Sequence, residues 1–275
     1  MTTITAPAPF RLDPEVFTRA AALIRKGGLT KGSFRMGPDE RSRVVIRTPE
    51  EVTNCRHCAM GAVLDVVDPE ILNVGNHSSE DPRVLPYLAL LGRVVSPEQA
   101  AQRIDEELDL APEDRTADWF FWMIGTYNDD FHRSVDEVAG KLEEAAVLAG
   151  RVNALRDAAA LIRKHGLTKH EYRSDEEEIL GCAHCTMGAV IDVVVPLSGP
   201  FDPQVKPLLS EVATTINPLW LTETDEPEAT RSEAYFSVIE KWNDAEERTA
   251  PEVADALDAT ANRLAGVVPT ETQEV

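Results

Sequence analysis

The sequence predicts a mainly α-helical fold. We expect two homologous helical domains packed as a pseudo-twofold pair, with at most a small β-hairpin in each. Three observations predict this fold: an internal repeat, apolar residues at helical spacing, and helix-capping motifs. The chain of 275 residues is long enough for two ordinary domains.

Three blocks of sequence occur twice in the same order. The segment A-A-A-L-I-R-K-G-G-L-T-K at 20–31 returns at 158–169, and N-C-R-H-C-A-M-G-A-V at 54–63 returns at 181–190. The third block, Y-N-D ending at Asp129, returns as W-N-D ending at Asp244. Insertions between matching blocks belong in loops. We therefore expect, in order, a flexible tail, two helical repeats that meet near 148–152, and a second tail: 1–12, 13–148, 152–266 and 267–275.

Helix signals begin each repeat. Asp13 and Pro14 supply an N-cap and a first-turn proline, and the glycines at 27–28 supply the left-handed residue that ends the helix. The run G-A-V-L-D-V-V predicts a second helix. Its Gly61 lowers helix propensity, which indicates close packing against another backbone.

Helix signals also end each repeat. An aromatic helix is expected at 117–127 and its copy at 232–242. Capping boxes at 134–137 and 249–252 start the last helix of each repeat. Only a hairpin around 37–39 is expected as a β element.

The ordered motifs carry a family resemblance. In the second repeat they read A-A-A-L-I, G-L-T, C-T-M-G-A, W-N-D and R-T-A-P-E-V. This order resembles a family of small uncharacterised domains of actinobacteria and their phages, present here in tandem. The first repeat departs at Tyr127, where the family has Trp, and Cys55 and Cys182 are additional to the family's pattern. The resemblance implies a helical fold and no established activity.

Charge and hydropathy limit the partners. The net charge of −21 argues against direct nucleic-acid binding and against anionic membranes. No apolar run is long enough to span a bilayer, and the N-terminus has no secretory pattern, so we expect a cytoplasmic protein. An acidic mimic of nucleic acid remains an alternative.

All four cysteines fall in the two Cys-x-His-Cys segments. Four thiolates form a standard zinc site, so the candidate ligands are Cys55, Cys58, Cys182 and Cys185, with His57 and His184 as substitutes. One arrangement joins the two repeats. The other places one site in each repeat, completed by a distant ligand such as His132. Our first expectation is that the protein holds no cofactor, and the alternative is a bound Zn²⁺ ion.

Two other interpretations of the cysteines stay open. A Cys-x-x-Cys at a helix start is typical of disulfide oxidoreductases, although no βαβ pattern accompanies it here. Free cysteine is also among the most buried residue types, so Cys58 and Cys185 are equally explained by packing beside the Gly-Ala turn.

The Asn-Asp pairs form a candidate polar site. Asn128, Asp129, Asn243 and Asp244 each follow an aromatic helix, where short polar side chains shape turns. The functional alternative places Asp129 and Asp244 in a pocket with the Cys-segment histidines, as acid–base groups or ligands.

An aromatic face forms a candidate interface. Trp119 and Trp122 lie three residues apart, on one helix face. We expect this face to pack on the other repeat or to bind a partner.

The leading functional hypothesis is a non-enzymatic binding or interaction protein with an unknown protein partner. The alternatives are a zinc-stabilised form of it, a thiol-dependent oxidoreductase, and the acidic mimic. No phosphate-binding loop, His-Glu-x-x-His or Gly-x-Ser-x-Gly motif occurs.

Overall fold

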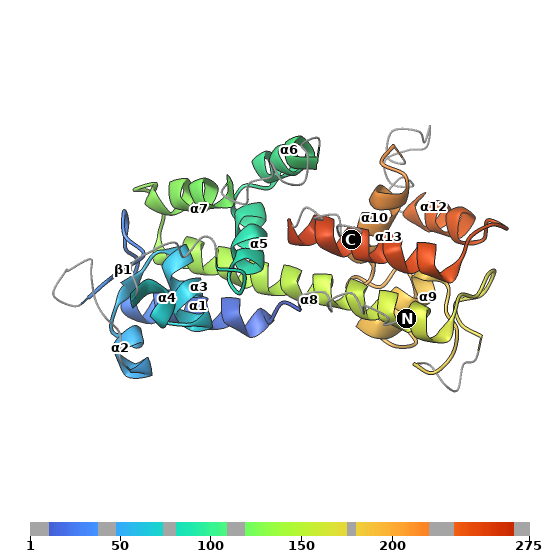
Figure 1. Cartoon of the computed structure of the whole chain (residues 1–275), viewed down its shortest axis with the longest axis horizontal. Coiled ribbons are helices and arrows are strands. Elements are labelled where there is room, and N and C mark those ends of the chain that lie inside the picture. The colour runs from blue at the N-terminus through green and yellow to red at the C-terminus, as the bar shows by residue number, and fades with distance from the viewer. Residues whose placement is uncertain are drawn as a thin grey trace, which may run out of the picture. The chain divides into compact units, whose positions relative to one another are not determined.

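The computed structural model describes residues 11–37, 48–73, 81–108, 119–174, 180–219 and 234–266. The described chain is mostly helical, as the sequence predicts (Figure 1). Its described residues form two compact units, one reaching to Gly150 and including Leu264–Gly266, the other lying within Arg151–Arg263. Most of both expected tails lies outside the described residues, although Leu12, assigned to the first tail, is buried.

The first unit contains seven described helices and two short strands. They are α1 (Pro14–Gly27), β1 (Arg35–Met36), α2 (Pro49–Thr53), β2 (Arg56–His57), α3 (Ala59–Val67), α4 (Glu70–Asn73), α5 (Leu85–Val95), α6 (Pro97–Leu108) and α7 (Trp119–Asp129). The second unit contains α9 (Thr186–Val194), α10 (Lys206–Ile216), α12 (Ala234–Asn243) and most of α13 (Ala250–Ala265).

One long helix crosses the expected boundary between the repeats. Helix α8 (Val135–His165) runs without a break through residues 148–152, where the sequence motifs change from one repeat to the next (Figure 1). Ala149, Val152 and Leu155 are buried at helical spacing. No proline interrupts this stretch, and Gly150 alone costs a helix only about 1 kcal/mol. The first half of α8 therefore belongs to one unit and the second half to the other.

The caps form as the sequence predicts. Asp13 accepts a hydrogen bond from the Glu15 N–H at the start of α1, and Gly28 ends that helix with φ 96°. At the start of α8, the Glu137 N–H donates to Ser134 Oγ at 3.2 Å and the Ser134 N–H donates back to the Glu137 carboxylate at 2.8 Å. These bonds satisfy backbone donors that a helix start otherwise leaves unpaired.

The β structure is as small as expected. Strands β1 and β2 pair antiparallel, with Arg35 opposite His57. Most of the turn expected around 37–39 lies outside the described residues. In the second unit, single bridges from His184 to Leu167 and Arg173 take the same place.

Two glycines bring the start of α3 and α9 against backbone. A Cβ on Gly61 would lie 1.8 Å from the carbonyl oxygen of Phe34, and one on Gly188 would lie 1.9 Å from that of Tyr172. The expected close packing is therefore confirmed in both units. This packing places the loops that contain Phe34 and Tyr172 directly against the starts of α3 and α9.

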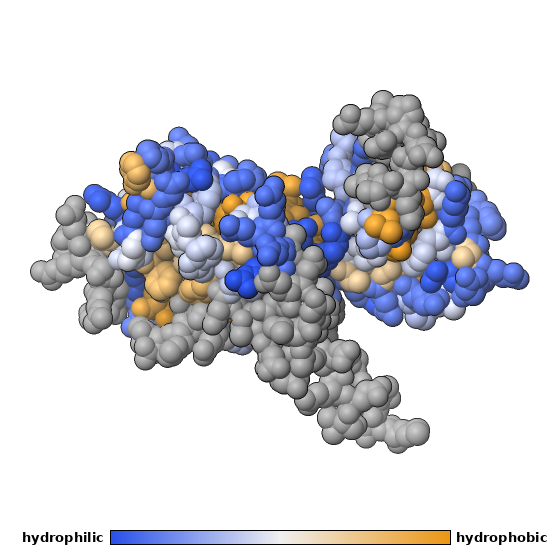
Figure 2. Space-filling model, turned by 90° about the horizontal axis from the view of Figure 1, so that it is seen from above, coloured by the Kyte–Doolittle hydropathy of each residue, from blue (hydrophilic) through white to orange (hydrophobic). Residues whose placement is uncertain are grey.

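Hydrophilic residues cover most of the described surface seen in Figure 2, and the apolar residues on that face lie in small separate patches. None of the described helices combines the length and apolarity that crossing a bilayer requires.

Candidate functional site

Each unit holds a buried arginine–aspartate–histidine network. In the first unit, Asp65 accepts from Arg35 Nη1 at 2.6 Å through one carboxylate oxygen, and its other oxygen lies 3.0 Å from His57 Nε2. The side chains of Arg35, Asp65 and His57 are 3%, 0% and 0% exposed.

The second unit repeats this network. Asp192 accepts from Arg173 Nη2 at 2.6 Å and lies 3.2 Å from His184 Nε2. Charges removed from water in this way need a partner, and the carboxylate supplies it. The network links the loop, the Cys segment and the helix that follows.

The sequence interpretation missed the central residues of these networks. Asp65 and Asp192 stand in the apolar runs G-A-V-L-D-V-V and G-A-V-I-D-V-V. An acidic residue in an otherwise apolar run is the sequence signal that could have identified them. The arginines 35 and 173 also recur at matching positions.

The two histidines therefore belong to a different grouping from the one predicted. His57 meets Asp65 and not Asp129, and His184 meets Asp192 and not Asp244. The functional alternative expected Asp129 and Asp244 in a pocket with these histidines, and the hydrogen bonds of the described residues do not join them. In both imidazoles Nδ1 is buried and has no hydrogen-bond partner among the described residues.

Cys58 and Cys185 act as helix caps. The sulfur of Cys58 accepts the Gly61 N–H at 3.2 Å, and that of Cys185 accepts the Gly188 N–H at 3.3 Å. Burial raises the pKa of the Cys58 thiol to about 12 and that of Cys185 to about 11. A thiol of this kind is almost entirely protonated near neutral pH, which disfavours a nucleophile.

The other two cysteines are also buried and form no disulfide. The Cys55 sulfur lies 3.5 Å from the Glu51 carbonyl oxygen, and burial raises the Cys55 pKa. Cys182 is buried as well.

The candidate zinc ligands gain no support from this geometry. Within the described ranges, no three His, Cys, Asp or Glu side chains gather to hold a metal ion. His132, the distant ligand considered above, is exposed and packs against the neighbouring Phe131.

The asparagines of the Asn-Asp pairs are structural. The Asn128 side chain accepts the Ala59 N–H at 3.0 Å and donates to the Thr30 carbonyl at 3.0 Å. Asn243 likewise accepts the Thr186 N–H and donates to the Thr168 carbonyl.

The aspartates of these pairs hold the loop above. Asp129 accepts the Gly32 N–H at 2.9 Å, and Asp244 accepts the His170 N–H at 3.0 Å. Burial alone would raise the pKa of Asp244, but hydrogen bonds from the His170 N–H and the Asn243 side chain outweigh it, so the net shift is downward.

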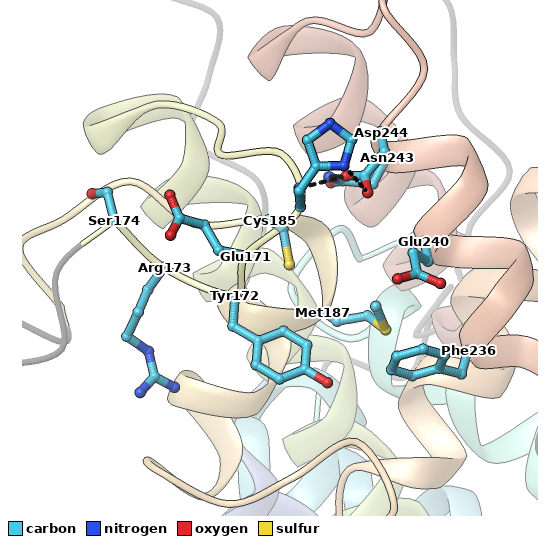
Figure 3. A pocket seen from close by; sticks show the side chains of 11 residues that line it. Glu171, Tyr172, Arg173, Ser174, Cys185, Met187, Phe236, Glu240, Asn243 and Asp244 are labelled. Atoms are coloured by element: carbon cyan, nitrogen blue, oxygen red, sulfur yellow. Dashed lines mark hydrogen bonds and ion pairs between the residues drawn. The ribbon is translucent and has the colours of Figure 1, made fainter.

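In the second unit these elements line a partly open cavity of about 490 Å³. Its polar side chains come from the loop, from α12 and from the residue that follows α12: His170, Glu171, Arg173, Ser174, Glu240, Asn243 and Asp244. Tyr172, Cys185, Met187 and Phe236 surround one space, and Glu240 lies beside it (Figure 3). The volume falls in the range of small-molecule sites.

The cavity lies where the two units differ. The repeat places His170, Tyr172 and Glu240 at the positions of Gly32, Phe34 and Gly125 in the first unit. In that unit Phe34 meets Phe121 edge to face, with ring centroids 6.4 Å apart. The scaffold contacts are thus the same in both units, while the side chains around this position are different.

His170 takes a backbone conformation that suits glycine. Its φ is 66°, and Gly32 at the matching position has φ 67°. The histidine side chain is 77% exposed, and its Nδ1 lies 3.0 Å from Asp244 Oδ2. A left-handed backbone conformation costs a residue that has a side chain about 1–2 kcal/mol. The second unit carries this strain at the edge of its cavity.

The tryptophan pair lines a smaller cavity in the first unit. Trp119 and Trp122 enclose about 300 Å³ together with Met123 and side chains of α6. Trp122 is 66% exposed, and Phe120, between the tryptophans in sequence, packs on Gly92 of α5.

Comparisons with known proteins place the chain in a family. No curated protein and no solved structure matches it. A family model matches residues 11–148 and again residues 151–263. The two matches agree with the internal repeat and with the duplicated buried networks. The chain therefore belongs to the family of unknown function DUF6197 and carries its domain twice.

Proposed function

We propose that this protein is a non-enzymatic binding protein whose binding site is the cavity of the second unit. The observation that carries the proposal is the cavity of about 490 Å³ at the position where the two units differ in their side chains. The asparagine anchors, the glycine packing and the arginine–aspartate–histidine networks occur in both units and serve the fold.

The state of the reactive groups favours binding over catalysis. Among the described residues, the thiol that lines the cavity belongs to Cys185, whose pKa of about 11 keeps it protonated near neutral pH. The imidazole of His184 is fully buried against Asp192, away from any substrate. A nucleophilic cysteine needs a deprotonated sulfur, and a general base needs access to the reacting atom; Cys185 lacks the first and His184 lacks the second.

The compartment and source are part of the proposal. Four buried cysteines that form no disulfide are consistent with a reducing cytoplasm. The motif pattern described above supports an actinobacterial or phage source. The occupant of the cavity is a small molecule or a side chain of a partner protein.

Methionine methyl NMR tests the proposed site. Met187 lines the cavity, and Met60 holds the matching position in the first unit, so it serves as an internal control. The full chain, labelled at its methionine methyls, is titrated with a panel of cationic, anionic and neutral metabolites. We expect at least one compound to shift the Met187 signal saturably and leave Met60 unchanged. If no compound in the panel does so up to millimolar concentration, the proposal is rejected.

A further inference from the structure

The cavity of the second unit combines negative charge with aromatic walls. Glu171, Glu240 and Asp244 bring three carboxylates to it. The charge of Arg173 is matched by Asp192, 2.6 Å away. Resting on the proposed function, we propose that this site binds a methylated or quaternary ammonium group.

The aromatic walls suit such a group. Tyr172 and Phe236 face the same space as Met187 (Figure 3), and Phe236 is held by stacking on Phe201 with ring centroids 6.0 Å apart. The face of an aromatic ring attracts a cation, and quaternary ammonium ions are the usual ligands of such sites. The N-methyl groups can contact these apolar walls directly, because a quaternary ammonium has no N–H donor that needs an acceptor.

The carboxylates extend a negative potential to the walls. Burial, then the neighbouring Cys185 and Glu240, raises the pKa of the Tyr172 phenol. Burial is the main cause of the raised pKa of Cys185, and the charge of Asp244 raises it further. Such a field attracts cations and disfavours anions. His170 lies 3.0 Å from Asp244 and offsets that carboxylate when it is protonated, so the negative charge of the cavity then comes from Glu171 and Glu240.

Two matched ligands test the charge requirement. Choline carries a quaternary ammonium, and its carbon analogue dimethylbutanol has nearly the same shape without the charge. Titration calorimetry of the full chain should show choline binding at least about tenfold more tightly than dimethylbutanol.

Two variants test which side chains of the cavity contact the ammonium group. Phe236→Leu keeps an apolar wall and removes the ring, and Glu240→Gln keeps the shape and removes the charge. Each variant should weaken choline binding by about threefold to tenfold. Glu240→Gln should leave dimethylbutanol binding unchanged, because that ligand carries no charge. Their controls are Phe121→Leu, at the matching position in the first unit, and Glu247→Gln, an exposed carboxylate outside the cavity. Neither control should alter choline binding. Circular dichroism melts verify that all four variants fold.

A third ligand separates the sources of the ammonium group. A peptide with trimethylated lysine that binds more tightly than choline identifies a protein side chain as the occupant, and the reverse order identifies a free molecule. Equal binding of choline and dimethylbutanol, or of choline to Phe236→Leu and the wild type, overturns the ammonium proposal. If the methionine panel nevertheless finds a neutral or anionic ligand at Met187, the binding function stands and only the ligand class is wrong. If nothing shifts Met187, both proposals fail.

Discussion

At the scale of single residues, Asp65 and Asp192 are the charges on which each unit depends. Each carboxylate binds one arginine and lies against one histidine, away from water. Replacing a buried ion pair by apolar groups can be neutral, but removing one partner leaves the other charge buried and uncompensated. The aspartate is the partner that the arginine and the histidine share.

The Asp192→Asn variant tests this role. It keeps the side-chain shape and leaves Arg173 without its counter-ion, so the free energy of unfolding should fall by about 3–5 kcal/mol. Urea denaturation followed by circular dichroism measures it, with the exposed Glu247→Gln as a control that should change by less than about 0.5 kcal/mol. A loss below about 1 kcal/mol for Asp192→Asn would show that the network is not needed for the fold.

The backbone of residue 170 gives a second residue-scale prediction. Because φ is 66° there, glycine suits the position better than any other residue. His170→Gly should be more stable than His170→Ala by about 1 kcal/mol, since both lose the imidazole and only alanine keeps the strain. Thermal melts of the two variants give the comparison, and equal stability would contradict the assigned strain.

The cysteine pKa values predict the behaviour at high pH. The folded pKa values of Cys58 and Cys185, about 12 and about 11, lie above the ordinary 9.0. The fold thus favours the protonated thiol. This contribution to stability is complete below pH 9 and is lost as the pH rises through the folded pKa values. Ultraviolet titration of thiolate should show no ionisation of these two residues below pH 9 in the native protein. Ionisation near neutral pH would favour the oxidoreductase alternative instead.

At the scale of elements, local signals account for much of the fold. Asp13, Ser134 and Thr249 start helices where the sequence predicts, because a cap depends on residues only two or three positions away. The continuity of α8 was not predicted. A change of repeat at 148–152 marks ancestry, and it does not require a break in the backbone.

The candidate site was only partly predictable. The sequence singled out Cys185 and Asp244, which line the cavity, but assigned them to different chemistry. The network residues Arg35 and Asp65 are 30 positions apart in the chain, and the cavity joins a loop, α9 and α12. Pattern and spacing carry no information about which distant segments meet.

The glycine at the start of α9 provides a prediction at this scale. In Gly188→Ala the new methyl group would overlap the Tyr172 carbonyl, 1.9 Å away, so we expect a loss of about 3 kcal/mol or more in unfolding free energy. Gly150→Ala is the matched control, because nothing lies within 4 Å of that position in α8. It should stabilise the protein by about 0.5–1 kcal/mol. Comparable stability of the two variants in urea denaturation would refute the packing argument.

At the scale of the whole molecule, duplication separates folding from recognition. Both copies of the domain keep the same cysteine cap, asparagine anchor and buried network. The second copy has His170, Tyr172 and Glu240 where the first has two glycines and Phe34. These three positions surround the cavity in which we place the binding site.

Returning these positions toward the first copy tests the central claim most directly. The triple variant His170→Gly, Tyr172→Phe, Glu240→Ala uses alanine at the last position to avoid a glycine inside α12. Binding at Met187 and the free energy of unfolding are measured on the same samples. We predict that the variant loses ligand binding by at least about tenfold while its unfolding free energy stays within about 1 kcal/mol of the wild type. Undiminished binding by a folded variant would contradict the assignment of recognition to the second unit's cavity.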